Sequence, residues 1–348
     1  MSSELPTIYL GMELNSPVIV GACPLTIQPE QVRQFAIAGA GAITLPSIMQ
    51  EQIVHAKLKD HDPDAAISQS GYQPQQDKYN GGVDSYLETI RTLKTRETIP
   101  IYASINAARS GEWIEYAEAI QSSGADALEL NWPPIITHPQ QSADEVESYL
   151  VEMVRNLCDR VSIPVAVKLN QRFTNLSSIA HKLQNAGADG LVVFSHLPEW
   201  DVSVDRLHWT IRWELSPIQS FGQVLEGVVR CRVGGLDVSL AASGGVRTGE
   251  DAVKAMIAGA SAVMVTSEVY REGPDVIRKI IEGISHFLDA SHFDSLIAFQ
   301  QACPTPEVGP ERLMRLEYVD PLTRSTHYYD PAPQTAVDTG DSYGHRTN

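Results

Sequence analysis

The stretch Ser123-Gly-Ala-Asp-Ala-Leu-Glu-Leu130 carries the pattern that decides the fold: a helical segment ends at Gly-Ala, and an apolar run follows at once. Glycine beyond a helix end adopts the left-handed cap conformation that other residues resist, and a short loop then leads into a buried strand. The same phrase recurs at residues 38–45, 186–193 and 258–265. Each copy predicts a junction from a helix to a strand.

Four further apolar runs complete the set of strands. Two of them open with Ile-Pro, at Ile99-Pro100 and Ile163-Pro164, and proline is tolerated at the first residue of a strand. The others lie at residues 17–21 and 237–241. Strands are therefore expected to begin near residues 17, 42, 100, 126, 164, 189, 237 and 261. Amphipathic helices are expected over residues 29–38, 83–96, 111–122, 143–160, 175–186, 217–231, 248–258 and 273–289.

This alternation predicts an α/β fold, a (β/α)8 (TIM) barrel, because nearly continuous apolar strands indicate a parallel sheet covered on both faces. An open doubly wound sheet is the alternative. Residues 7–14 are expected to form a small N-terminal hairpin at the barrel floor, and segments 47–82 and 195–216 to form loops over the C-terminal face. One barrel domain is expected over 1–303, followed by a Pro-rich, extended or disordered C-terminal tail over 304–348.

Composition excludes several classes of function. The 348 residues carry a net charge of −17, which disfavours binding to nucleic acid or to an anionic membrane surface. No apolar run is long enough for a membrane span and the opening residues lack a signal peptide, so a cytoplasmic protein is expected. Cys23, Cys158, Cys231 and Cys303 lie far apart, which predicts reduced thiols and no metal site.

A phosphate site is predicted after the last two strands. Gly244 and Gly245 follow the seventh strand, ahead of a helix capped by Thr248, and the eighth strand ends at Thr266-Ser267. Glycines allow backbone N–H groups to approach an anion closely, and the loops after strands seven and eight of such barrels commonly bind phosphate. A tight turn without a ligand is the alternative for the two glycines.

With these residues, the chain resembles the dihydroorotate dehydrogenase-like branch of the FMN-binding (β/α)8 oxidoreductases, from about Leu10 to Gln300. The matching phrases are Asn15–Thr26, Ser104-Ile-Asn106, Glu129-Leu-Asn131, Val167-Lys-Leu169, Ser243–Val246 and Glu272-Gly-Pro274. The resemblance implies FMN as the cofactor. It assigns cofactor contacts to Ala22, Cys23, Asn106, Asn131, Lys168 and Ser195, and phosphate contacts to Gly244, Gly245, Thr266 and Ser267.

Lys168 also stands out on chemical grounds. A lysine that ends an otherwise apolar strand is costly to bury without an anionic partner, and a reduced flavin carries negative charge near N1. A solvent-facing lysine on the barrel rim is the alternative.

The sequence departs from the family where the substrate would bind. Pro134 stands where a Cys or Ser acts as the base in dihydroorotate dehydrogenases, and proline accepts no proton. Pro46 replaces a flavin-contacting lysine, Ile136 and Ser195 replace substrate-binding asparagines, and a further such segment is replaced near Gln73-Pro74. The substrate is therefore expected to differ from dihydroorotate.

Two histidines are candidate replacement bases, His138 and His196, of which His196 is taken together with Lys168 as the catalytic pair. An exposed loop histidine is the alternative for each. Trp200, Trp209 and Trp213 form either an aromatic wall over a pocket or, as the favoured interpretation, packing in the core or a lid.

The leading hypothesis is an FMN-dependent oxidoreductase that acts on a small-molecule substrate. Three alternatives stay open: oxidation of dihydroorotate to orotate in pyrimidine biosynthesis, a flavin-free barrel for a phosphorylated metabolite, and a non-catalytic binding protein. Substrate, electron acceptor and oligomeric state, including a homodimer, are left open by the sequence.

Overall fold

The computed structural model describes residues 5–60, 62–111, 113–132, 138–217 and 220–304, and four later positions, Arg315, Val319, Leu322 and Thr323. The chain divides into two compact units, Met1–Pro304 and Thr305–Asn348. Every described strand lies in the first unit. Most of residues 304–348 lies outside the described residues, so the extended or disordered tail stays a prediction.

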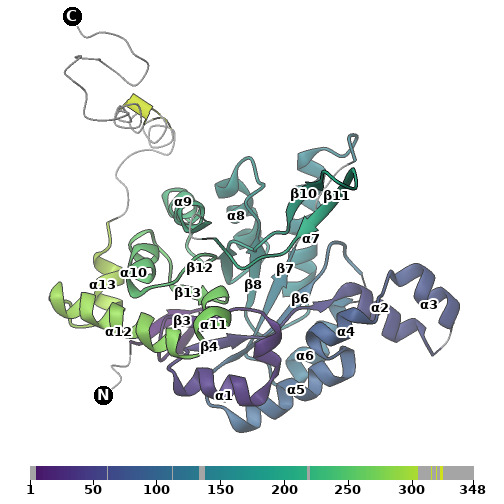
Figure 1. Ribbon diagram of the computed structural model, residues 1–348, viewed down its shortest axis with the longest axis horizontal. Helices are drawn as coiled ribbons and strands as arrows, with labels where there is room; N and C mark the ends of the chain where they lie inside the picture. Colours follow the sequence, from purple (N-terminus) through teal and green to yellow (C-terminus); the bar gives the residue numbers. More distant parts are fainter. Residues whose placement is uncertain are drawn as a thin grey trace, which may run out of the picture. The chain divides into compact units, whose positions relative to one another are not determined.

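Eight parallel strands close into a barrel in the first unit (Figure 1). The strands, in order of pairing, are β3 (Val18–Val20), β4 (Ala42–Thr44), β6 (Ile101–Asn106), β7 (Ala127–Asn131), β8 (Val165–Leu169), β9 (Gly190–Val193), β12 (Ser239–Ser243) and β13 (Ala262–Val265). β13 pairs in turn with β3, which closes the ring. The predicted (β/α)8 barrel is confirmed, and the open sheet is wrong because no edge of the ring is left unpaired.

Helices surround the barrel and bury one face each (Figure 1). In α12, for example, Val276, Ile280 and Ile284 are buried at helical spacing. The helices that follow the barrel strands are α1 (Pro29–Ile37), α5 (Val83–Arg96), α6 (Trp113–Ser122), α7 (Ala143–Cys158), α8 (Leu176–Asn185), α9 (Ser220–Val233), α10 (Gly249–Ile257) and α12 (Asp275–Ala290), with shorter η1 (Pro24–Ile27), α11 (Ser267–Glu272) and α13 (Leu296–Ala302). Within the described residues, no helix has the length and apolar character that a membrane crossing requires.

The barrel floor is the predicted hairpin, formed by β1 (Thr7–Tyr9) and β2 (Met12–Leu14). Tyr9 packs in a cluster with side chains of the barrel strands, and its ring centroid lies 6.2 Å from that of Tyr102. Small strand residues leave room for these rings. They are Ala42, Ala127, Ala166, Ala241 and Ala262. The floor is therefore apolar and filled, and polar side chains farther along the same strands lie toward the carboxyl end.

Segment 47–82 contains β5 (Ile48–Met49), α2 (Gln50–Leu58), α3 (Pro63–Ser70) and α4 (Gln75–Asn80), so the prediction of loops here was wrong. Its helices are short, and α2 lacks a clear apolar face, so hydrophobic periodicity gave little signal. Buried polar contacts hold the segment instead. Asn80 donates from Nδ2 to Gln52 Oε1 at 2.7 Å and to the Ser47 carbonyl at 2.8 Å.

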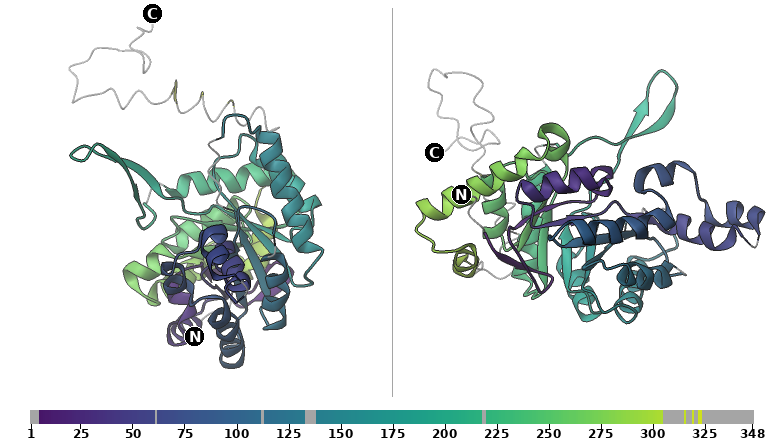
Figure 2. Two further views of the ribbon diagram at one scale, coloured as in Figure 1. Left: turned by 90° about the vertical axis from the view of Figure 1, so that its right-hand side faces the viewer. Right: turned by 90° about the horizontal axis from the view of Figure 1, so that it is seen from below.

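Segment 195–216 forms an antiparallel hairpin, β10 (Glu199–Ser203) and β11 (His208–Arg212), where the sequence predicted a loop. Figure 2 shows this hairpin projecting from the barrel in both views. Trp200, Trp209 and Trp213 are 53%, 70% and 67% exposed, so the favoured interpretation of core or lid packing is wrong. The reason is that the hairpin points away from the barrel instead of lying across its end.

Candidate active site

Three polar residues predicted from the sequence lie side by side at the carboxyl ends of neighbouring strands. Asn106 of β6 pairs in register with Asn131 of β7, which pairs in turn with Lys168 of β8. Ala127 and Ala166 belong to the cluster inside the barrel and lie an even number of residues before Asn131 and Lys168. Because strand side chains alternate, the three polar residues also face the interior.

Lys168 is paired with Glu129 inside the barrel. Its Nζ lies 3.3 Å from Glu129 Oε1, and the two side chains are only 11% and 3% exposed. Ser104 Oγ lies 3.5 Å from the same carboxylate oxygen, and Ser47 Oγ lies 2.8 Å from Ser104 Oγ. The protein therefore supplies the anionic partner that burial of Lys168 demands, and that burial is not by itself evidence of a flavin.

Glu129 was not singled out from the sequence as this partner. Glu129 lies two residues before Asn131, so alternation of side chains puts it on the same side of β7. This spacing was the sequence signal that could have identified it as a residue of the site. Its second carboxylate oxygen, Oε2, is buried and has no hydrogen-bond partner among the described residues. An unsatisfied buried oxygen costs free energy, so this position is suited to a donor from a ligand or a water.

Ser195 and His196 follow β9 and join this polar group from the next strand. The Ser195 N–H donates to the Leu169 carbonyl at 2.6 Å, and its hydroxyl donates to Asn131 Oδ1 at 3.3 Å. The His196 ring meets the Trp213 ring edge-on, with centroids 4.9 Å apart. Its Nε2 is buried and makes no hydrogen bond within the described chain, so that nitrogen is available to a proton or a ligand.

The other sequence candidates are not gathered here. His138 is exposed and lines a separate surface cavity with Glu145 and Tyr149. Pro134 and Ile136 lie outside the described residues.

Ala22 and Cys23 come directly after β3, where the Gly21 N–H donates to the Val265 carbonyl at 3.1 Å. Cys23 is 3% exposed. Burial raises the pKa of its thiol, and hydrogen bonds with the Leu25 backbone and the Tyr270 side chain only partly offset this. The thiol is therefore protonated at neutral pH.

Tyr79, on α4, is a site candidate that sequence reasoning missed. Burial raises its pKa to about 12, and the neighbouring Cys23 and Glu129 contribute in the same direction. α4 packs against η1, immediately after Cys23. No local sequence pattern predicts that Tyr79 lies near the site, because its approach to the barrel depends on how segment 47–82 folds back.

The two glycines after β12 have the backbone conformation that their residue type allows. Gly244 and Gly245 have φ of 112° and 79°, in the left-handed region. A Cβ on Gly245 would lie 2.7 Å from Ser220 Oγ and 2.9 Å from the Phe221 nitrogen. Thr248 then caps α10 as predicted, accepting from the Asp251 N–H.

Thr266 and Ser267 lie after β13, which pairs with β12, so the predicted phosphate residues stand after neighbouring strands. Thr266 is the N-cap residue of α11. A Cβ on Gly21 would lie 2.4 Å from Thr266 Oγ1, so glycine is required at that crossing. Ser267 Oγ accepts from the Ser216 N–H at 2.9 Å and retains its own hydroxyl hydrogen for another acceptor.

A buried carboxylate ties these loops together. Glu268 is 2% exposed and pairs with both Arg247, whose Nε lies 3.2 Å away, and Arg271. The Arg247 nitrogen is within ion-pair distance but lacks hydrogen-bond geometry. Arg271 also donates to the Ser216 carbonyl at 3.0 Å, so the chain segment that leaves the hairpin is anchored to α11.

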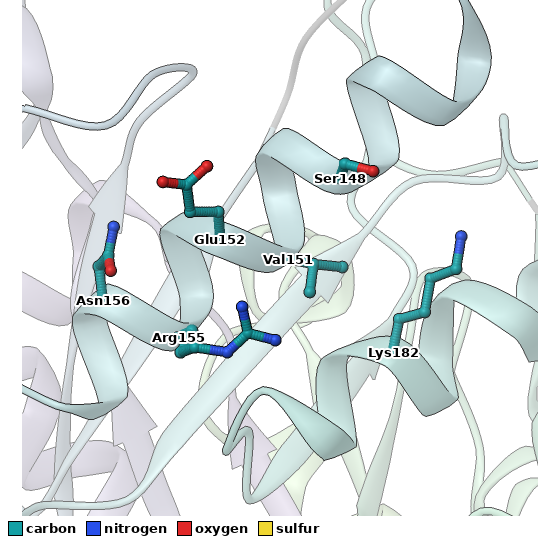
Figure 3. Close-up of a pocket in the computed structure, with 6 residues that line it drawn as sticks. All are labelled: Ser148, Val151, Glu152, Arg155, Asn156 and Lys182. Atoms are coloured by element: carbon teal, nitrogen blue, oxygen red, sulfur yellow. The ribbon is translucent and has the colours of Figure 1, made fainter.

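One cavity lies away from this group, on the flank of the barrel. Figure 3 shows its lining residues, Ser148, Val151, Glu152, Arg155 and Asn156 on α7 and Lys182 on α8. Its volume is about 490 Å³, and Lys182 is held by Glu147 at 3.0 Å. None of the predicted site residues lines it. In the parts of the chain that the structure describes, no three His, Cys, Asp or Glu residues gather into a metal site.

A family profile and individual relatives both relate this chain to proteins described as dihydroorotate dehydrogenases. A family profile described as dihydroorotate dehydrogenase matches residues 228–288, which include β12, β13 and the loops after them. The catalytic subunit of dihydroorotate dehydrogenase B (NAD(+)) from Methanosarcina acetivorans is 28% identical over 251 residues, covering 71% of this chain and 79% of the relative. The protein of the same name from Geobacillus kaustophilus is 27% identical over 199 residues, covering 57% and 61%.

The match to the family profile falls on the two loops at the carboxyl end of the barrel, and the relatives align with most of the barrel domain. The closed barrel of eight parallel strands agrees with that relationship. The chain is therefore similar to the dihydroorotate dehydrogenase-like family of (β/α)8 barrels.

Proposed function

We propose that this protein is an FMN-dependent oxidoreductase that acts on a small molecule other than dihydroorotate. The observation that carries the proposal is the row of Asn106, Asn131 and Lys168, in register on three strands, at the same end of the barrel as the glycine turn after β12. Amide groups and an ammonium group in one row suit the polar edge of an isoalloxazine ring.

The residues present fit FMN in two respects. Gly244 and Gly245 have left-handed φ values and no Cβ that would obstruct the approach of an anion to their backbone N–H groups. Thr266 and Ser267 follow the neighbouring strand, β13, and offer hydroxyls. The Lys168 ammonium has three N–H donors, and Glu129 takes one of them within the described chain. When bound, FMN would supply hydride transfer at its N5 atom.

In this proposal the protein's own residues bind, orient and move a proton. Gly244, Gly245, Thr266 and Ser267 would hold the phosphate. The Ala22–Cys23 backbone would contact the ring, and Asn106, Asn131, Lys168 and Ser195 would contact its polar edge. Lys168 is kept in position by Glu129. His196 would be the base, because its Nε2 is buried without a hydrogen-bond partner among the described residues and the edge-on contact with Trp213 orients the ring.

The change of substrate rests on the residues that replace the family's own. Proline at position 134 removes the proton acceptor, and isoleucine at position 136 removes a hydrogen-bonding side chain. Dihydroorotate would then lack the proton acceptor and the hydrogen-bonding partner that the family supplies at these two positions.

The experiment is the visible spectrum of the purified protein, with mass spectrometry of any released ligand. Flavin absorbance, or its appearance after incubation with FMN, supports the proposal, whereas protein that stays colourless with FMN overturns it. Gly245→Ala should weaken FMN binding, since its Cβ would strike Ser220 and Phe221. Gly235→Ala is the matched control, because Gly235 has a similar φ of 81° and open space around it.

Dihydroorotate oxidation with NAD(+) as the electron acceptor is the second candidate, favoured by the names of the relatives. Anaerobic mixing of the FMN-loaded protein with dihydroorotate distinguishes the two. Rapid bleaching of the flavin supports the second candidate and removes the claim of an altered substrate.

A further inference from the structure

Tyr79 is held at the end of the barrel by the residue that follows it, Asn80. Asn80 is fully buried, and its Nδ2 donates to the carbonyl of Ser47, shortly after β4, at 2.8 Å. Ser47 Oγ lies 2.8 Å from Ser104 Oγ, which lies 3.5 Å from Glu129 Oε1. A short series of buried polar contacts therefore connects the end of α4 to the carboxylate inside the barrel.

Hydrogen bonds on both sides of Tyr79 along the chain keep α4 in this position. Gln52 Nε2 donates to Asp77 Oδ1 at 2.7 Å and to Asn80 Oδ1 at 2.9 Å. The Gly82 N–H donates to the same Asn80 oxygen at 3.0 Å. Tyr79 lies between Asp77 and Asn80, so the backbone that carries its phenol is restrained from both directions.

The phenol of Tyr79 lies on the side of α4 that faces the candidate active site. Burial raises its pKa to about 12, and Cys23 and Glu129 contribute to the same increase. A neighbouring charge shifts a pKa only when it lies close to the group. α4 also packs against η1, the helix that begins directly after Cys23. The hydroxyl is therefore near both the residues after β3 and the carboxylate of β7.

The Tyr79 hydroxyl has no hydrogen-bond partner among the described residues. Two other tyrosines of this region differ in that respect. The Tyr86 hydroxyl accepts from the Ser104 N–H at 2.8 Å, and the Tyr116 hydroxyl donates to the Val83 carbonyl at 2.6 Å. A partly buried hydroxyl without a partner costs free energy, so it is suited to an oxygen of a bound ligand. With a pKa of about 12, this hydroxyl is a donor at neutral pH.

Tyr79 and His196 approach the end of the barrel from opposite sides. The segment that carries Tyr79 leaves the barrel after β4, and His196 follows β9. These two strands are four apart in the closed ring of eight. His196 Nε2 is also buried and has no partner within the described chain. A ligand between the two side chains would therefore meet a proton acceptor on one side and a hydrogen-bond donor on the other.

We propose that the Tyr79 hydroxyl binds the substrate by donating a hydrogen bond to a carbonyl or carboxylate oxygen. The inference rests on the proposed function, which places the substrate beside His196. The class of substrate follows from the chemistry of the contact, because a neutral phenol donates to an oxygen acceptor and does so more strongly when that acceptor is ionised. The charge of Lys168 is already balanced by Glu129, so a substrate oxygen at this site is recognised through hydrogen bonds.

The test is isothermal titration calorimetry of the FMN-loaded protein with three small probes. Succinate offers only carboxylates, 2-butanone offers only a carbonyl, and 2-oxobutyrate offers both. We expect 2-oxobutyrate to bind and to shift the flavin absorption bands. Tyr79→Phe should raise its dissociation constant by about 10–100-fold, the usual effect of losing a hydrogen bond to a charged group. Binding of succinate or of 2-butanone that depends on Tyr79 supports the proposal and identifies which oxygen is recognised.

Tyr149→Phe is the matched control, because it removes the same hydroxyl from a tyrosine that is 42% exposed on α7, outside the site. It should leave the dissociation constants of all three probes unchanged. The melting temperature checks that each variant is folded, and both substitutions keep the aromatic ring.

Equal dissociation constants for the unmodified protein and Tyr79→Phe overturn the proposal, as does the failure of all three probes to bind. A protein that takes up no FMN overturns the proposed function instead. Calorimetry does not need a flavin, so the same titrations then decide the role of Tyr79 separately. Probe binding that Tyr79→Phe weakens keeps the contact, and binding that it leaves unchanged, or no binding, removes it.

Discussion

The buried pair of Lys168 and Glu129 is expected to couple strongly in a double-mutant cycle. At the observed separation of 3.3 Å, two unit charges attract by about 5 kcal/mol at an effective dielectric of about 20. Taking both ions out of water costs several kcal/mol each, so the pair as a whole adds little stability. Removing one partner leaves the other charge buried alone, and Glu129→Gln or Lys168→Met should each cost about 3–5 kcal/mol.

The double variant removes both charges and should cost at least about 3 kcal/mol less than the sum of the single variants. Urea unfolding of the ligand-free protein measures all four free energies of unfolding. Glu88–Arg91 is the control pair, because its ions lie 3.2 Å apart but the side chains are 68% and 53% exposed. It should couple by less than about 1 kcal/mol. Equal coupling for the two pairs, or additive costs for Glu129 and Lys168, would refute the view that burial makes this interaction strong.

Two further predictions concern pH and catalysis. Burial raises the pKa of Cys231 to about 12 from an ordinary value of 9.0, so between those values the unfolded chain holds fewer protons than the folded one and stability falls as pH rises, by up to about 1.4 kcal/mol per pH unit. Cys231→Ala should flatten this alkaline loss in urea unfolding, and an unchanged slope would contradict it. With a true substrate in hand, anaerobic stopped-flow reduction of bound FMN should be slowed by about 10²–10⁴-fold in His196→Ala and far less in Pro134→Ala, because an imidazole accepts a proton and a pyrrolidine ring does not. A larger effect of Pro134→Ala would show that the base has been assigned wrongly.

The barrel could be predicted from the sequence because its signals are local. The Gly-Ala phrase marks the end of a helix within a few residues of the strand that follows, as at Gly124 and Gly187, which have φ of 95° and 105°. Asn106 and Asn131 were singled out by the family resemblance, and Lys168 by the resemblance and by its charge at the end of an apolar strand. Their meeting in one row follows because strand ends in a parallel barrel lie at one edge.

What the sequence did not reveal depends on contacts between distant segments. Glu129 and Lys168 are 39 residues apart, and their pairing follows only from the register of β7 and β8. Tyr79 approaches Cys23 because segment 47–82 folds back on buried contacts of Asn80 and Gln52. Tryptophan is a residue type that usually packs in a hydrophobic core. Only the direction in which the hairpin projects shows that its tryptophans are exposed.

Inside the barrel, the residues that stabilise the fold are different from those expected to contact the substrate. Substrate-contacting residues can therefore change while the fold is kept. The floor is filled by Tyr9, Tyr102 and alanines, none of which is among the positions that depart from the family. Those positions, among them Pro46, Pro134 and Ser195, follow strand ends along the chain, where barrel proteins place their ligand contacts. Lys168 stands between the two regions. Because Glu129 already balances its charge, any contribution of Lys168 to cofactor binding comes from its remaining N–H donors. Loss of FMN binding and loss of barrel stability are therefore separate consequences of substituting it, and each has its own measurement.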